Sequence, residues 1–379
     1  MTDSGSGIPF LTGGNLKDGK LSLDGASYIT PEKHSKLTSG HLLEDDIVIA
    51  VRGSLGALGY VNTDNSGWNI NSQLAILRTD KSELYGKFLI QYLLSWTGQN
   101  ELLKRQTGSA LKQLPIGAIK DVEVPITSIA EQGKIGEYFS NLDNLITLHQ
   151  RKCDETKELK KFMLQKMFPK NGEKKPEIRF EGFTDDWEQR KLSEIYASIG
   201  NAFVGTATPY YVEQGHFYLE SNNIKDGQIN HNSEVFINDE FYERQKDKWL
   251  HTGDMVMVKS GHVGHAAVIP EELDNSAAHA LIMFREPKVK IEPYFLNYQY
   301  QTNKIKKKIE GITTGNTIKH ILASDMQEFV VDLPDYDEQK QIGDYFRNLD
   351  HLITLHQRKC DEIKEIKKFM LQNMFPQKG

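Results

Sequence analysis

The sequence predicts an α+β chain in which two similar mixed α/β domains are separated by two long helices that form an antiparallel coiled coil. The main observation is a repeat: residues 131–170 recur as residues 338–377, with 31 of 40 positions identical. In both copies apolar residues follow a heptad spacing. Three short motifs of the intervening segments also recur, at nearly the same offset. Two repeated helices and two related domains follow from these observations.

Composition sets the class of protein. A chain of 379 residues with 38% hydrophobic residues has room for two or three globular domains. No apolar run is long enough to span a bilayer, and the first residues do not read as a signal peptide. The two cysteines, Cys153 and Cys360, are equivalent positions of the repeat rather than a disulfide framework or a zinc cluster. We therefore expect a reducing, cytoplasmic location without a membrane partner.

The apolar positions of each repeated helix form one stripe. In the first copy the stripe is Ile135, Phe139, Leu142, Ile146, His149, Cys153, Thr156 and Met163, and in the second it is Ile342, Phe346, Leu349, Ile353, His356, Cys360, Ile363 and Met370. A helix with a single apolar stripe is unstable alone, so its twin is the expected partner. An antiparallel pair relates the two equal copies by a pseudo-two-fold axis, and near this axis His149 should lie close to His356. Both histidines can be read as polar residues that fix the register or, alternatively, as metal ligands.

Prolines mark the expected ends of the two helices. Each should begin after a strand that ends in proline, at 124–125 or 333–334, and stop before the proline of 168–169 or 375–376. The expected organisation is a first domain over 1–128, a helix over 129–169, a linker over 170–183, a second domain over 184–335 and a second helix over 336–376. Taken alone, the pattern of the helices also allows an alternative, a coiled coil that merely joins two unrelated domains.

The two intervening domains share one fold. Residues 10–19 align with 218–227, residues 46–56 with 254–264, and residues 107–112 with 314–319. Short runs rich in Val and Ile predict strands at 47–51, 255–258 and 328–333. Helical spacing predicts helices over 84–96 and 293–309, the latter with Pro293 in its first turn and Gly311 beyond its end.

Two motifs resemble a known family. They are the entry into the first helix (Pro125, Ile126, Glu131, Gln132) and the opening of the second domain, Arg179-Phe180-Glu181-Gly182-Phe183 followed by Trp187-Glu188-Gln189-Arg190-Lys191-Leu192. With the alternation of variable and repeated segments, they resemble the specificity subunit of type I restriction-modification enzymes. The resemblance implies two target-recognition domains, each of which reads one half of a bipartite site in double-stranded DNA. It also implies that the helices act as a spacer and dock two methyltransferase subunits and, through them, two restriction/translocase subunits. S-adenosylmethionine would bind the methyltransferase, so no cofactor and no metal are expected in this chain, which would be cytoplasmic and associated with the nucleoid.

The first domain departs from this pattern. The counterpart of Trp187 would fall before Met1, so we expect the first domain to lack the opening segment. We interpret residues 1–7 as a replacement leader, of either an engineered or a naturally shortened start.

The charge balance argues against strong binding of DNA by the chain alone. Residues 1–130 carry 12 basic and 13 acidic side chains, and residues 184–335 carry 15 and 23. Because affinity for phosphate normally requires Lys and Arg, contacts must come from local clusters or from the methyltransferases.

Three polar loops recur at matching places and supply candidate contacts to DNA. In the first domain these are Asn15, Lys17, Arg52, Ser54, Ser109 and Lys112, and in the second they are Asn222, Asn223, Lys225, Lys259, Ser260, His262, Asn316 and Lys319. Such side chains have suitable donors for base edges and phosphates, but each can equally be a solvated loop residue. Lys304, Lys306, Lys307 and Lys308 can be read as a phosphate grip or as a solvated helix end.

No motif of an enzyme is found. The sequence has no phosphate-cradling loop, dinucleotide turn or nucleophile elbow, and it lacks the Asn/Asp-Pro-Pro-aromatic tetrapeptide of adenine methyltransferases. His262, His265 and His279 lack counterparts in the first domain, which argues against a metal site. The alternatives to a DNA-reading module are a protein-interaction adapter with two related domains on a rod and an autonomous hydrolase, for which no titratable constellation is found.

Overall fold

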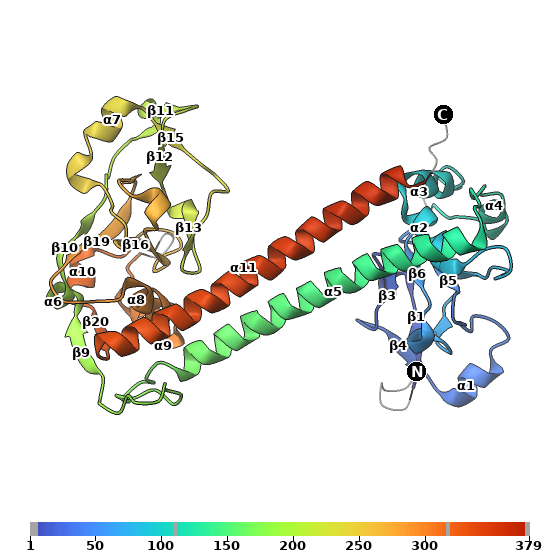
Figure 1. Cartoon of the computed structure of the whole chain (residues 1–379), viewed down its shortest axis with the longest axis horizontal. Helices are drawn as coiled ribbons and strands as arrows, with labels where there is room; N and C mark the ends of the chain where they lie inside the picture. The colour runs from blue at the N-terminus through green and yellow to red at the C-terminus, as the bar shows by residue number, and fades with distance from the viewer. Residues whose placement is uncertain (1–6, 110–111, 316–318, 376–379) are drawn as a thin grey trace. The chain divides into compact units, whose positions relative to one another are not determined.

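The computed structural model describes residues 7–109, 112–315 and 319–375. The chain divides into two compact units: unit 1 comprises residues 1–151 and 356–379, and unit 2 comprises residues 152–355. Two helices of 38 residues each, α5 (Ile129–Lys166) and α11 (Tyr336–Asn373), contribute to both units (Figure 1). Within the described residues, none of the helices has the length and apolarity required to cross a membrane.

Unit 1 combines two three-stranded sheets with short helices. One sheet has the order β4-β1-β7 and the other β6-β5-β8, and β2 and β3 form a hairpin. The strands are β1 (Ile8–Leu11), β2 (Leu16–Lys17), β3 (Lys20–Leu21), β4 (Ser27–Ile29), β5 (Ile47–Ala50), β6 (Leu58–Tyr60), β7 (Asn69–Ile70) and β8 (Leu74–Leu77). The helices are α1 (Pro31–Lys36), α2 (Gly86–Leu94), α3 (Trp96–Leu103) and α4 (Ile116–Lys120), with 3-10 turns at Gly13–Asn15 and Thr63–Asn65.

Unit 2 repeats this plan with additional strands. Its two larger sheets have the orders β10-β19-β16-β17 and β11-β15-β12-β18, and the pairs β13-β14 and β20-β9 complete it. The strands are β9 (Glu188–Lys191), β10 (Tyr196–Asn201), β11 (Tyr211–Val212), β12 (His216–Leu219), β13 (Ile224–Lys225), β14 (Gln228–Ile229), β15 (Phe236–Ile237), β16 (Met255–Val258), β17 (Ala266–Val268), β18 (Ala277–Ala278), β19 (Leu281–Pro287) and β20 (Val330–Leu333). The helices are α6 (Leu192–Ile195), α7 (Asp239–Glu243), α8 (Pro293–Tyr300), α9 (Asn303–Ile312) and α10 (Ala323–Gln327), with 3-10 turns at Thr208–Tyr210, Ser221–Asn223, Lys246–Lys248 and Glu271–Leu273.

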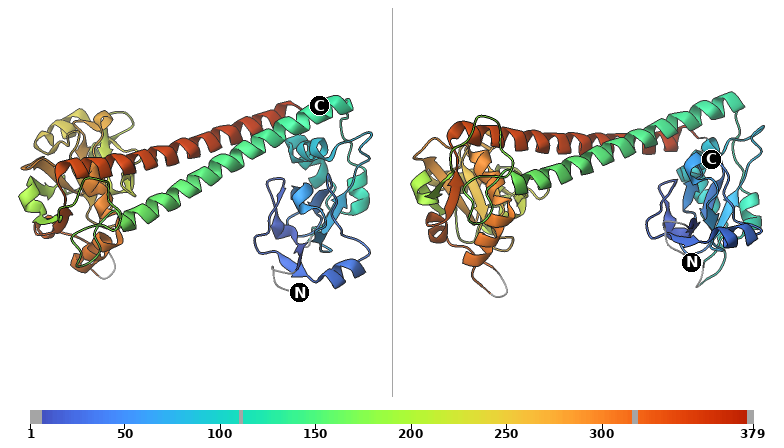
Figure 2. Two further views of the ribbon diagram at one scale, coloured as in Figure 1. Left: turned by 60° about the horizontal axis from the view of Figure 1, so that its bottom comes forward. Right: turned by 90° about the horizontal axis from the view of Figure 1, so that it is seen from below.

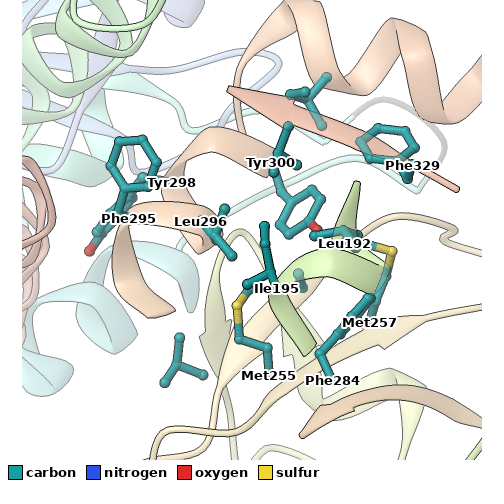
Figure 3. Close-up of a cluster of buried hydrophobic side chains, with 14 of the residues drawn as sticks. Leu192, Ile195, Met255, Met257, Phe284, Phe295, Leu296, Tyr298, Tyr300 and Phe329 are labelled. Atoms are coloured by element: carbon teal, nitrogen blue, oxygen red, sulfur yellow. The ribbon is translucent and has the colours of Figure 1, made fainter. Parts of the chain in front are cut away.

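Each unit has a core formed by its central sheet, one domain helix and the long helices. In unit 2 side chains of β16, β19, α6 and α8 meet in a cluster that includes Met257, Phe284 and Leu296 (Figure 3). Phe346 of α11 is fully buried in the same cluster. In unit 1 the equivalent residue Phe139 of α5 is fully buried with Phe88 of α2. The repeated helices are therefore part of each domain's core.

The long helices lie side by side in opposite directions within each unit (Figure 2). In unit 1 Lys367 Nζ lies 2.7 Å from Asp143 Oδ1, and in unit 2 the equivalent Lys160 Nζ lies 2.6 Å from Asp350 Oδ1. All four side chains are largely shielded from solvent, which strengthens charge-assisted hydrogen bonds. This repeated pair of ion pairs shows the antiparallel coiled coil that the sequence predicted.

The predicted stripe residues differ in their environment. Phe139, Leu142, Ile342, Phe346 and Leu349 are buried, whereas Ile135, Ile146, His149, Ile353 and His356 are half-buried. Cys153 and Cys360 are buried and free. The Nδ1 atoms of His149 and His356 lie 3.1 Å apart, so the two histidines are neighbours as the repeat predicted.

The helix expected over 84–96 is confirmed as α2, and α3 starts directly after it at Trp96. The helix expected over 293–309 is instead broken into α8 and α9, and α9 includes Gly311. The breaks lie at equivalent residues: the hydroxyl of Ser95 caps α3 and that of Thr302 caps α9. An N-cap hydroxyl satisfies a free amide of the new helix, which favours a break at this point.

The entry into each long helix uses the repeated Glu-Gln pair. Gln132 accepts a hydrogen bond from the backbone N–H of Tyr85 (3.0 Å), and Gln339 accepts one from that of Glu292 (3.1 Å). The preceding segments differ, because 330–333 forms β20 while 121–127 is not a strand. The prediction of a strand ending at Val124-Pro125 is therefore wrong, since no strand in the described part of unit 1 pairs with this segment.

Candidate nucleic-acid interface

The first predicted loop is a tight hairpin in both units. Asp18-Gly19 joins β2 to β3, and Asp226-Gly227 joins β13 to β14. All four residues have positive φ (52° and 80°, then 52° and 86°), the conformation of a two-residue hairpin turn. Asp-Gly is favoured there because Asp tolerates and Gly readily adopts this region. Each hairpin then bridges to the central sheet, Gly19 to Gly59 and Gly227 to Ala267.

The second and third predicted loops meet each other in both units. In unit 1 Arg52 and Thr107 both form β-bridges with Gln113. In unit 2 Ser260 and Thr314 both form β-bridges with His320, at equivalent positions. Since the hairpin bridges to the same sheet, the structure gathers the three sequence-predicted loops around one sheet in each unit.

Two of the predicted contact residues instead hold a loop together. Asn15 and Asn223 are each 1% exposed. The Asn15 amide accepts from the Thr12 N–H (2.9 Å) and donates to the carbonyls of Ser22 and Asp24 (both 3.0 Å). The Asn223 amide accepts from the Glu220 N–H (2.9 Å) and donates to the Asn230 carbonyl (3.1 Å). These amides are buried and their hydrogen bonds are already satisfied. The prediction that Asn15 and Asn223 contact DNA is therefore wrong, and both residues are structural.

Most of the remaining candidates face solvent. The exposed set comprises Lys17, Arg52, Ser54, Ser109, Lys112, Asn222, Lys225, His262 and Lys319. Lys259 and Ser260 are half-buried, and Lys259 Nζ donates to Asn201 Oδ1 (3.2 Å). Asn316 lies outside the described residues. Nine polar side chains are thus available at the loops of the two units.

In unit 2 the three loops surround a cavity of about 340 Å³. Asp226, His262, His265 and Lys319 line it from the loops, and Lys306 lines it from α9. Burial lowers the pKa of His265, against the opposing effect of Asp226. His265 Nδ1 accepts a hydrogen bond from the Asp226 N–H (3.2 Å), so the neutral imidazole fixes the hairpin turn.

The lysine run of α9 is divided between two roles. Lys304 forms an ion pair with Asp332 (2.6 Å) in which both side chains are nearly buried. Lys308 donates to the Val330 carbonyl (3.3 Å), and burial lowers its pKa. The reading of all four lysines as a phosphate grip is therefore wrong for Lys304 and Lys308, while Lys306 and Lys307 are exposed.

The described residues contain no group of three or more His, Cys, Asp or Glu side chains arranged to hold a metal ion. His279 is engaged on both ring nitrogens, with Glu220 Oε1 (3.1 Å) and the Gly205 carbonyl (3.0 Å).

The comparisons with known proteins decide the family. The model of the type I restriction modification DNA specificity domain matches residues 3–158 and 184–365, which is most of the chain and both halves of it. The chain belongs to this family. Its members are the DNA-recognition component of type I restriction-modification systems and are not catalytic.

Curated relatives and solved structures agree with this family. The putative type I restriction enzyme MjaX specificity subunit of Methanocaldococcus jannaschii is 24% identical over 96% of this chain and 85% of its own. The type I restriction enzyme MjaVIII specificity subunit of the same organism is 23% identical over 95% and 83%. The crystal structure of the S subunit from M. genitalium covers 100% of this chain and 92% of its own, with a TM-score of 0.64 at 15% identity. A chain from a study of type I R-M complex assembly and conformational transition covers 96% and 90%, with a TM-score of 0.51 at 16% identity.

Two exposed residues of these loops were not among the candidate contacts predicted from the sequence. Gln113 and His320 bridge the second and third loops and are exposed. They are equivalent positions, just after the repeated Thr-Gly motifs, so the internal alignment was the signal that could have found them.

Proposed function

We propose that this chain reads a bipartite sequence in double-stranded DNA, one half with the loops of each unit. The observation that carries the proposal is the repeated gathering of three polar loops on a shared fold, with different side chains in the two units. Arg52 and Lys112 are exposed in unit 1, and His262 and Lys319 in unit 2. Because one domain with a few base contacts discriminates modestly, two linked readers multiply the specificity.

We further propose that the helix pair docks two methyltransferase subunits and, through them, two restriction/translocase subunits. Each unit exposes the same apolar set on its helix pair. Unit 1 carries Leu145, Ile366 and Phe369, and unit 2 carries the equivalent Leu352, Leu159 and Phe162, all 41–62% exposed. Exposed apolar side chains grouped on one surface are typical of interaction sites, and two matching sets suit two identical subunits.

The partners also explain how a chain with net charge −6 functions on DNA. Affinity for phosphate comes mainly from cationic side chains, so the methyltransferases would supply much of it. S-adenosylmethionine would bind to the methyltransferase and not to this chain. The complex would work in the cytoplasm, associated with the nucleoid.

Methylome sequencing of cells that carry the complete complex tests the reading function. We expect a split, adenine-methylated motif, and replacement of residues 184–335 by another second domain should change one half only. A change in both halves or in neither would reject the assignment of one half-site to each unit. Binding by the reconstituted complex without sequence preference would support the adapter instead.

The docking function is tested by stoichiometry. We expect Phe369→Ser and Phe162→Ser each to reduce the complex from two methyltransferase subunits to one, as measured by native mass spectrometry. Leu23→Ser, at a residue of unit 1 that is also exposed but lies outside the helices, is the control. Retention of two subunits in both variants would contradict the proposed docking surface.

A further inference from the structure

Unit 1 has a groove of about 1160 Å³ between its domain and the long helices. The domain wall of this groove carries an aromatic side chain that the fold does not require. Trp96, the first residue of α3, is 65% exposed. The equivalent first residue of α9 in unit 2 is Asn303, which is also exposed. Because the repeat places Asn at this position, the exposed Trp indicates contact with another molecule, and Trp is enriched at protein interfaces.

The rest of the domain wall also differs from its equivalent in unit 2. The half-buried Leu94 lines the groove where unit 2 has Gln301. Lys20 of the β2–β3 hairpin lines it where unit 2 has Gln228. The Lys20 Nζ atom donates to Thr147 Oγ1 of α5 (2.6 Å), which holds the hairpin against the helix. The domain wall of unit 1 is therefore both more apolar and more basic than that of unit 2.

The helix wall of the groove belongs to the repeated sequence. It includes Ile146 of α5 and Lys364, Lys367, Lys368 and Leu371 of α11. The equivalent residues of unit 2 have the same identities. The groove thus combines a helix wall common to both units with a domain wall specific to unit 1.

A methyltransferase that docks in the same way on both units does not account for this groove. With 3.6 residues per turn, Lys364, Lys368 and Leu371 share one side of α11. Ile366 and Phe369, which belong to the proposed docking set, face another side of the same helix. Since the domain wall also differs between the units, the occupant should bind once per chain and apart from the methyltransferases.

The charges at the groove favour an acidic occupant. Five lysines and two aspartates line it. One of the aspartates, Asp143, already pairs with Lys367. Lys364 and Lys368 are exposed and face acidic residues of their own helix at 3.8 and 4.0 Å, and exposed pairs of this kind contribute little. Their ammonium groups, and that of the exposed Lys17, are available to the carboxylates of a partner.

The mixture of apolar and basic side chains favours a protein segment over duplex DNA. Phosphates would pair with the lysines, but they would leave Trp96 and Leu94 without apolar partners, because the bases of a duplex are stacked on one another. An amphipathic helix with Asp or Glu beside its apolar stripe satisfies both kinds of side chain. Burial of such a stripe in a groove is a common mode of peptide recognition.

We propose that this groove of unit 1 binds an acidic amphipathic helix of a partner protein, one per chain. The apolar residues of the bound helix pack against Trp96, Leu94 and Leu371. Its carboxylates pair with the exposed ammonium groups of Lys364 and Lys368. This binding is separate from the reading of DNA and from the docking of methyltransferases.

The test selects peptides from a random library displayed on phage against the complete chain. We expect enrichment of peptides with a net negative charge and apolar residues at i, i+3 or i+4, and i+7. One selected peptide, measured by calorimetry, should bind at one site per chain and more weakly as the salt concentration rises. Failure to enrich such peptides, or binding at two equal sites, would overturn the proposal.

Variants of the chain identify the groove. Trp96→Asn, which installs the residue of unit 2, should weaken binding of the selected peptide by about 30-fold, because a buried Trp is a typical hot spot. Lys364→Gln combined with Lys368→Gln should weaken it by about fivefold. The matched control, Lys157→Gln combined with Lys161→Gln, makes the same change at the equivalent exposed residues of unit 2 and should leave binding unchanged.

Two results would reject the groove as the site of an acidic helix. Equal binding to Trp96→Asn and to the unaltered chain would place the peptide elsewhere. Displacement of the peptide by a short DNA duplex, with the chain alone, would assign the groove to DNA instead. All of these measurements use the chain without methyltransferase, so they are independent of the proposed function.

Discussion

Glu338→Gln is expected to destabilise unit 2 strongly. The carboxylate is fully buried and accepts three hydrogen bonds, two of them from Arg179, whose side chain is only 13% exposed. Removal of one partner of a buried ion pair costs about 3–5 kcal/mol because the other charge stays buried without compensation. The amide oxygen of Gln still accepts one bond, so we expect the lower end, about 3 kcal/mol. For a unit of roughly 200 residues this lowers the Tm by about 6–12 °C.

The repeat supplies a matched control. Glu131→Gln makes the same change at the equivalent residue of α5, where the side chain is exposed, and should alter stability by no more than about 0.5 kcal/mol. Differential scanning calorimetry measures both variants, and hydrogen exchange of β9 and β20 assigns the loss to unit 2. Equal effects of the two substitutions, or a loss below about 1 kcal/mol for Glu338→Gln, would refute the stabilising role of the buried ion pair between Arg179 and Glu338.

Three further predictions concern the loops. Asn223→Ala should destabilise unit 2 by about 1–3 kcal/mol in chemical denaturation, because buried backbone groups lose their partners, and the exposed Asn222→Ala should change it by less than about 0.5 kcal/mol. Burial lowers the pKa of His265 in the folded state, so the unfolded chain binds the proton more readily and stability should fall as the pH drops below about 6.5; His265→Asn should flatten this dependence, and an unchanged pH profile would contradict the burial argument. Lys319→Ala should weaken binding of DNA by the assembled complex and reduce the salt slope by about one, whereas an unchanged slope would remove Lys319 from the interface.

The repeat made much of the fold predictable. Equal copies of a heptad helix require equal partners, so the antiparallel pair and the neighbouring His149 and His356 followed from the pattern alone. The loops could be located because Asp-Gly and Thr-Gly motifs recur at fixed offsets. Which side chains of a loop face solvent could not be predicted, because the residue type alone does not distinguish a buried Asn that closes a loop from an Asn that is exposed. Asn15 and Asn223 are the first kind, and Lys304 is likewise taken by Asp332, more than 20 residues away in the sequence.

The missing strand of unit 1 depended on a long-range partner, and the helix starts after Ser95 and Thr302 depended on local caps that residue type alone does not reveal. Ser95 and Thr302 are ordinary residues in an apolar helical pattern, and only the turn of the chain between the two helices makes them caps. Likewise the apolar run at 122–126 has strand propensity, but a strand needs a neighbour. The equivalent run becomes a strand in unit 2 because β9 lies beside it.

The joints between the long helices and the domains are hydrogen bonds of Gln132 and Gln339, and these bonds do not depend on the side chains of the domain. Both glutamines bond to main-chain groups: Gln132 to those of Tyr85, Glu83 and Thr127, and Gln339 to those of Glu292 and Pro334. A main-chain amide is present whatever side chain mutation places there, proline excepted. A gene of this design can therefore exchange its variable segments by recombination within the repeated stretches, and every product keeps the two glutamines and their main-chain partners. New sequence preferences can then arise by shuffling existing segments, without any change in these two joints.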